Sequence, residues 1–138
     1  MSTLVSPSLL AANFLDLRSD IEMINQSEAD WLHLDVMDGM FVPNISFGFP
    51  VLEAVAKVCK KPLDVHYMIE KPERYIERTA KLGAMMMNVH YEASVHLHRT
   101  VQEIHNAGMK AGVDVLVSGS YVFKSPDPYK TIRELKSL

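Results

Sequence analysis

Three strand-like segments of the sequence place polar side chains on a face that is otherwise apolar. In HLDVMDG, His33, Asp35 and Met37 share one face, because side chains two positions apart on a strand point the same way. The same spacing groups side chains in the next two segments: Asp64, His66 and Met68 in DVHYM, and Asn88 and His90 in MNVHY. Burying such groups costs free energy unless they are paired or bind a metal.

Two imidazoles and one carboxylate form a suitable ligand set for one borderline divalent metal ion, namely zinc, iron, manganese or cobalt. The alternative is a hydrogen-bonded group of core polar residues without a metal, and the spacing leaves both interpretations open. Neither HExxH nor CxxC occurs in the sequence to sharpen the choice. His96, His98 and His105 fall in a helical stretch and are interpreted as solvated side chains.

The elements that must position these residues alternate regularly along the chain. Strands are predicted at 4–10, 29–39, 62–69, 85–91 and 110–120, and helices at 15–27, 50–60, 72–82, 94–107 and 127–138. Gly83 and Gly108 are the predicted caps of two helices. Strict alternation predicts an α/β fold of parallel (β/α) units of the TIM-barrel type, truncated to about five, since a complete barrel has eight.

Composition limits the classes of partner. The chain has 138 residues and a formal net charge of -3 without a basic cluster, so we expect one domain over 1–138 and no nucleic-acid partner. We expect no membrane partner either, because no apolar run approaches the roughly 20 residues that span a bilayer. A single cysteine, Cys59, and an N-terminus without a positively charged leader favour a cytoplasmic location.

Five segments of the sequence form a recognisable set: PSLLAANF (7–14), HLDVMDGMFVPNISFG (33–48), DVH-M-I (64–69), GMKAG (108–112) and DVLVSGS (114–120). On these segments the sequence resembles the ribulose-phosphate 3-epimerases. The long motif at 33–48 is highly specific. Residues 1–113 resemble the first half of the family's barrel, and residues 114–138 resemble its last βα unit.

The resemblance implies an isomerase of the pentose phosphate pathway that interconverts D-ribulose 5-phosphate and D-xylulose 5-phosphate. One aspartate removes the proton at carbon 3, a divalent metal stabilises the developing oxyanion, and a second aspartate returns a proton to the opposite face. Asp35 matches the first aspartate and also a metal ligand, together with His33 and His66. The residues that match substrate-contacting positions are Ser8, Met37, His66, Met68, Gly119 and Ser120.

The chain departs from the family after KAGV at 110–113. The family continues there with its fifth to seventh strand units, including the second aspartate and the main phosphate-holding loops, whereas this sequence passes directly to DVLVSGS. The alternative function is therefore a catalytically incomplete chain that binds metal or a partner chain without turnover. A decarboxylase or aldolase-like synthase of the same superfamily is disfavoured, because no lysine occupies positions 33–39. Open parallel edges predict a homo-oligomer.

Overall fold

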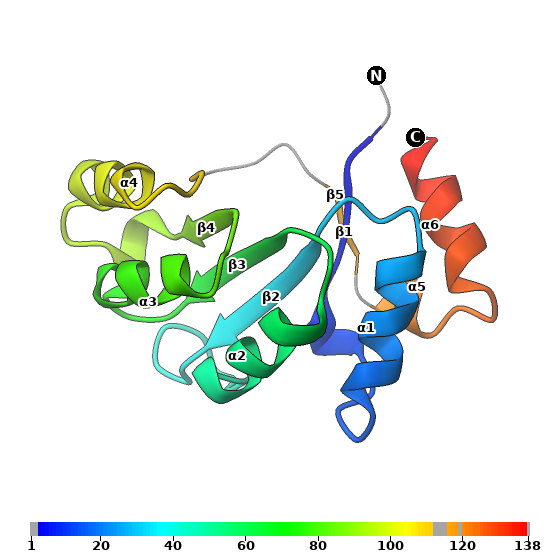
Figure 1. The fold of residues 1–138 in the computed structure, drawn as a ribbon. Helices are drawn as coiled ribbons and strands as arrows, with labels where there is room; N and C mark the ends of the chain where they lie inside the picture. Colours follow the sequence, from blue (N-terminus) through cyan, green and yellow to red (C-terminus); the bar gives the residue numbers. More distant parts are fainter. Residues whose placement is uncertain (1–2, 112–115, 119, 138) are drawn as a thin grey trace.

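A computed structural model describes residues 3–111, 116–118 and 120–137. Its parallel strands are β1 (Val5–Pro7), β2 (Leu32–Met37), β3 (Leu63–Met68), β4 (Met86–Val89) and β5 (Leu116–Ser118). The strands β2, β3 and β4 form one sheet, and β1 pairs with β5 (Figure 1). A bridge between Ser8 and His33 joins the pair to the larger sheet, so the strands run in the order β5-β1-β2-β3-β4. Among the described residues this row stays open.

Helices alternate with the strands, as the sequence predicts. They are α1 (Leu17–Gln26), α2 (Phe49–Val58), α3 (Ile76–Lys81), α4 (Leu97–Asn106), α5 (Ser120–Phe123) and α6 (Pro128–Lys136), with 3-10 turns η1 (Leu9–Ala11), η2 (Pro72–Tyr75) and η3 (Tyr91–Ala93). Gly83 and Gly108 follow α3 and α4 with φ of 79° and 85°, a left-handed conformation that suits glycine, which confirms both predicted caps. Every helix in the described part of the chain falls short of the length and apolar character that a bilayer crossing requires.

The outer face of the sheet carries the apolar core. Leu34 and Val65 are fully buried on neighbouring strands, and Tyr67 is equally buried. The Tyr67 hydroxyl lies 2.6 Å from Oγ1 of Thr79 on α3, so this side chain faces the helix layer. The alternation in β2 and β3 thus separates an apolar face under the helices from a polar face that holds the candidate site.

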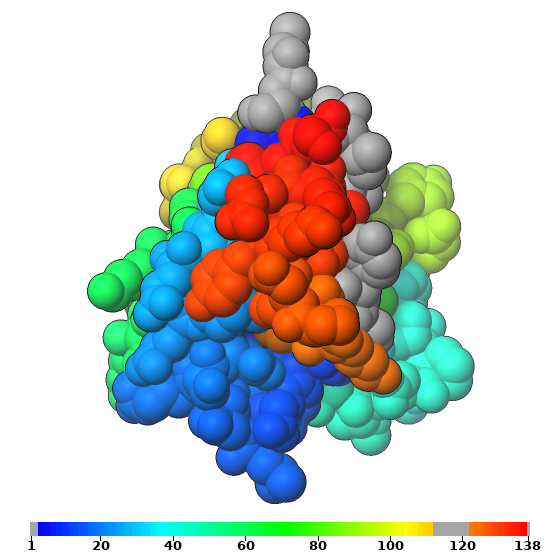
Figure 2. All heavy atoms as spheres, turned by 90° about the vertical axis from the view of Figure 1, so that its right-hand side faces the viewer, coloured from blue at the N-terminus to red at the C-terminus, as the bar shows by residue number. Residues whose placement is uncertain are grey.

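The last helix fastens the C-terminal end of the chain to the first strand. Lys136 Nζ lies 2.8 Å from both carboxylate oxygens of Asp30, and Asp30 Oδ2 accepts a hydrogen bond of 2.8 Å from the backbone N–H of Val5. Figure 2 shows α6, in red, packed above the blue N-terminal elements. This anchor keeps β1, and with it Ser8, beside β2.

The segment 110–120 differs from the single strand that the sequence predicts. Lys110 bridges Met86 beside β4, whereas β5 pairs with β1 at the other end of the row. Residues 112–115 lie outside the described part of the chain. The helix α5 was not predicted, because four residues are too short to show a helical period. The assignment of 114–138 to the last βα unit of a barrel stays a prediction.

Substituting Leu34 by alanine tests the buried outer face. Loss of a fully buried leucine leaves a cavity, so we expect the free energy of unfolding to fall by about 2–5 kcal/mol. Urea unfolding followed by circular dichroism measures this change. Leu15→Ala is the control, because Leu15 is 98% exposed and its loss should cost less than about 0.5 kcal/mol. Equal effects of the two substitutions would contradict the assigned core.

Candidate metal centre

Two neighbouring strands align their polar residues in one register. The parallel pairing of β2 with β3 places His33 opposite Asp64 and Asp35 opposite His66. All four side chains lie on the sheet face turned away from the helices, where strand alternation predicts them. Burial decreases along this face toward the carboxyl ends of the strands: His33 is buried and His66 is half-buried. The polar group therefore opens toward the strand ends, where parallel α/β folds bind ligands.

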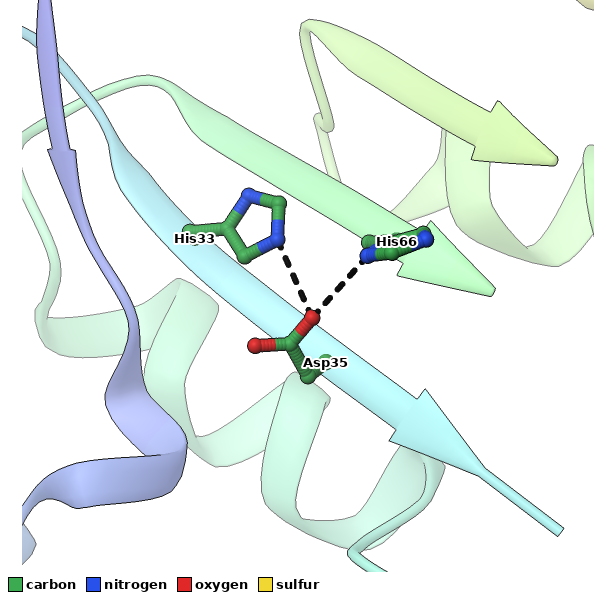
Figure 3. Close-up of side chains that lie close together, drawn as sticks. All are labelled: His33, Asp35 and His66. Carbon is green, nitrogen blue, oxygen red and sulfur yellow. Dashed lines mark hydrogen bonds and ion pairs between the residues drawn. The ribbon is translucent and has the colours of Figure 1, made fainter. Parts of the chain in front are cut away.

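Three ligand atoms converge at this point. Nε2 of His33 and Nδ1 of His66 each lie 3.0 Å from Oδ1 of Asp35 (Figure 3). Within the described residues, these three side chains can present one ligand atom each with all atoms within 4.8 Å of one another. The arrangement confirms that the three residues predicted as metal ligands come together.

The donor set fits a divalent metal ion. Zinc bonds to nitrogen and oxygen are about 2.0–2.2 Å long, which places tetrahedral ligand atoms roughly 3.3 Å apart. The separations of 3.0 Å between the histidine nitrogens and Asp35 Oδ1 lie close to that spacing. Three protein ligands that leave another position open are typical of catalytic sites. His33, Asp35 and His66 would therefore hold the metal and leave room for a substrate oxygen.

The cluster carries strong internal electrostatic coupling. Burial alone would lower the pKa of His33, but hydrogen bonds and negative charge from Asp35 and Asp64 outweigh it and raise the pKa to about 9. Burial alone would raise the pKa of Asp35, but hydrogen bonds from His33, His66 and Ser8 hold it well below its usual range. At neutral pH the cluster is therefore an imidazolium between two carboxyl groups.

Ser8 fixes the second oxygen of the central carboxylate. Its hydroxyl donates to Asp35 Oδ2 at 2.5 Å, from the turn that follows β1. The sequence resemblance gives Ser8 a substrate-contacting role, which stays a prediction, and in the structure its hydroxyl contacts Asp35. Both carboxylate oxygens of Asp35 thus have donors, which restricts rotation of the side chain.

Further polar side chains surround the cluster, from β3, from β4 and from the residue directly after β4. Asp64 Oδ2 lies 2.7 Å from Nδ1 of His33, and Asp64 Oδ1 accepts from Nδ2 of Asn88 at 2.6 Å. His90 places its Nε2 2.7 Å from Nε2 of His66, and the two rings stack with centroids 4.9 Å apart. Strand alternation placed these residues on the correct faces, but the sequence analysis assigned none of Asp64, Asn88 and His90 to the site.

The other predicted site residues are more dispersed. Met37 and Met68 end β2 and β3 and are half-buried, and Met37 Sδ accepts from Nδ2 of Asn44 at 3.5 Å. Gly119 lies outside the described residues. Ser120 begins α5, and its side chain is likewise outside the description. The roles of these four residues in substrate binding stay predictions.

The chain matches known proteins over most of its length. The sequence pattern of the ribulose-phosphate 3 epimerase family matches residues 4–123. The ribulose-phosphate 3-epimerase of Bacillus subtilis (strain 168) is 53% identical over 109 residues, which is 79% of this chain and 50% of the relative. The chloroplastic ribulose-5-phosphate-3-epimerase of Arabidopsis thaliana is 47% identical over 112 residues, which is 80% of this chain and 40% of the relative. The chain spans about half the length of the curated relatives it matches.

Solved structures support the fold class. Orotidine 5'-monophosphate decarboxylase from Methanocaldococcus jannaschii, complexed with the inhibitor BMP, superposes with a TM-score of 0.63 at 10% identity, covering 99% of this chain and 98% of that one. The tryptophan synthase alpha subunit of Campylobacter jejuni has a TM-score of 0.56 at 14% identity, covering 78% of this chain and 52% of that one. Such low identities show the fold alone, namely parallel β/α units of the TIM-barrel type. The sequence match over 4–123 and the identity of 53% show more: the chain belongs to the ribulose-phosphate 3 epimerase family.

Proposed function

We propose that this chain carries the proton-abstracting half of a site that interconverts D-ribulose 5-phosphate and D-xylulose 5-phosphate. The observation that carries the proposal is the meeting of His33, Asp35 and His66 at one point, in a chain of the ribulose-phosphate 3 epimerase family. The substrate is a sugar phosphate, the cofactor is one divalent metal ion, and the location is the cytoplasm.

The chemistry begins with a weak carbon acid. A bound divalent metal supplies fixed positive charge beside the oxygen that becomes negative when carbon 3 loses its proton. Asp35 is the base that takes this proton, and its low pKa keeps the carboxylate ionised before the reaction. Ser8 holds Oδ2 of Asp35 in place. The half-buried Met37 and Met68 line the apolar side of the substrate, and Gly119 with Ser120 holds its phosphate.

Inversion also requires an acid on the opposite face of carbon 3. Asp35, Asp64 and the three histidines all project from the same sheet face, so they serve one side of a substrate. Turnover therefore also requires a second acid that faces carbon 3 from the other side. The second candidate function is metal binding without turnover, which is favoured by the direct passage from KAGV to DVLVSGS.

A coupled assay for conversion of D-ribulose 5-phosphate tests the first candidate. The 138-residue chain with added Zn²⁺, Mn²⁺ or Co²⁺ should turn over substrate when a second copy supplies the acid on the opposite face of carbon 3. Asp35→Asn should reduce the rate at least about 100-fold, because the isosteric amide cannot accept the proton. His98→Gln is the matched control, since His98 is exposed on α4, and should leave the rate unchanged.

Calorimetric titration of the same proteins with Zn²⁺ separates the two candidate functions. Zn²⁺ binding that His66→Gln weakens, in a folded chain without turnover, would select the second function. Neither turnover nor Zn²⁺ binding in the folded chain would contradict both.

A chain prepared without metal should lose stability as the pH rises toward 9. Folding raises the pKa of His33 from 6.5 to about 9, so the stabilisation is complete below about pH 6.5 and disappears as the pH passes about 9. At 1.36 kcal/mol per pKa unit the loss is on the order of 3 kcal/mol. Urea unfolding between about pH 6 and 10 measures it. His33→Gln should show no such decline, and a flat profile for the unsubstituted chain would refute the charged cluster.

We also propose that copies of the chain associate through the ends of the strand row. In the described residues, β5 pairs with β1 alone, and beyond β4 the pairing consists of a bridge to Lys110. Exposed parallel edges offer backbone hydrogen-bonding groups to another chain. Size-exclusion chromatography with light scattering should therefore give a mass of at least twice the 15.6 kDa chain. A well-folded monomer at assay concentration would disprove the association.

A further inference from the structure

Asp64 and Asn88 make hydrogen bonds behind His33 that no step of the proposed function uses. Asp64 Oδ2 lies 2.7 Å from Nδ1 of His33, and Asp64 Oδ1 accepts from Nδ2 of Asn88 at 2.6 Å. Asp64 is 1% exposed, so bulk water does not substitute for either partner. The three residues come from β2, β3 and β4. His33 pairs with Asp64 in register, whereas Asn88 lies opposite His66 and reaches Asp64 diagonally.

The chemistry of a carboxylate fixes the orientation of both neighbours. An ionised carboxylate only accepts hydrogen bonds, so Asn88 must present its amide nitrogen and His33 must keep a proton on Nδ1. When Nδ1 keeps its proton, Nε2 is the ring nitrogen whose lone pair can bind a metal. That nitrogen lies 3.0 Å from Oδ1 of Asp35, where the other ligand atoms meet.

We propose that Asp64, oriented by Asn88, is the positioning residue that selects the metal-binding tautomer of His33. The inference rests on the proposed function, because the metal belongs to that site. Histidine ligands commonly donate their second ring N–H to a carboxylate, and loss of that partner typically lowers metal affinity 10- to 100-fold. Asp64 thus acts on the metal through His33.

The role is specific to one of the two histidine ligands. Behind His66 stands the imidazole of His90, with Nε2 to Nε2 at 2.7 Å. An imidazole can donate or accept at that nitrogen, so His90 permits either tautomer of His66. Asp64 permits one tautomer of His33.

Two variants separate tautomer selection from packing. Asp64→Leu removes the acceptor with a side chain of similar size, so the proton of a neutral His33 should move to Nε2, where Asp35 still offers an oxygen. In the double variant D64N/N88D, the carboxylate at position 88 accepts from the amide nitrogen at position 64. The amide oxygen at position 64 then turns toward His33 and restores the acceptor. A packing defect would worsen in the double variant, whereas tautomer selection should recover.

Two quantities are measured for each variant, namely the protonated ring nitrogen of His33 and the affinity for Zn²⁺. Circular dichroism checks that each protein is folded. Long-range ¹H–¹⁵N NMR of the chain without metal, at about pH 10 where His33 is neutral, reports which ring nitrogen is protonated. Nδ1 should be protonated in the unsubstituted chain and in D64N/N88D, and Nε2 in D64L. Competition with a chelating dye should show Zn²⁺ affinity about 10- to 100-fold weaker in D64L and largely restored in the double variant.

The outcomes distinguish this proposal from the proposed function. A D64L variant with protonated Nδ1 and unchanged Zn²⁺ affinity would overturn the positioning role. A double variant that binds Zn²⁺ as weakly as D64L would also overturn it. Tautomers that follow the prediction in proteins that bind no metal would support the selection by Asp64 and overturn the metal assignment.

Discussion

The parallel register between β2 and β3 is the constraint on which the whole site depends. It sets Asp35 beside His66 and His33 beside Asp64, so each carboxylate has a histidine on the adjacent strand. A shift of one residue would turn every polar side chain of one strand toward the helices. The apolar partners resist that shift, because Leu34 and Val65 would then leave the core. Apolar packing on one face of the sheet therefore fixes which polar side chains are neighbours on the other face.

Charge balance explains how so polar a face is tolerated. An isolated buried carboxylate is costly, but Asp35 has donors on both oxygens and Asp64 has donors from β2 and β4. Binding of a divalent cation would place positive charge between these same side chains, without new buried negative charge. The hydrogen bonds that hold the cluster together are thus the same contacts that orient it for a metal.

The sequence predicts on which face of the sheet a side chain lies better than it predicts which residues that side chain contacts. Alternation with a period of two correctly predicted that the polar side chains lie on one side of each strand. Glycine correctly predicted the ends of α3 and α4. Both predictions succeed because they depend on residues close together in the sequence. The roles of Asp64, Asn88 and His90 depend on which strands are neighbours and in which register, and no local period contains that information. The same limit explains 110–120: one strand-like run divides between Lys110 beside β4 and β5 beside β1. A local residue pattern indicates that a segment is extended. Which strand that segment pairs with depends on contacts between residues far apart in the sequence.

Metal retention and turnover make different demands on this chain. The atoms of the proposed metal site and their hydrogen-bond partners all belong to β2, β3 and β4 or to residues directly after β1 and β4. These side chains hydrogen-bond to one another. The proposed epimerisation would also need a group that faces the substrate from the other side, which a single sheet face does not provide. The chain spans about half the length of its curated relatives and nevertheless brings His33, Asp35 and His66 together. The proposed metal site therefore lies within the described residues, whereas the proposed inversion at carbon 3 also needs a group across from this face.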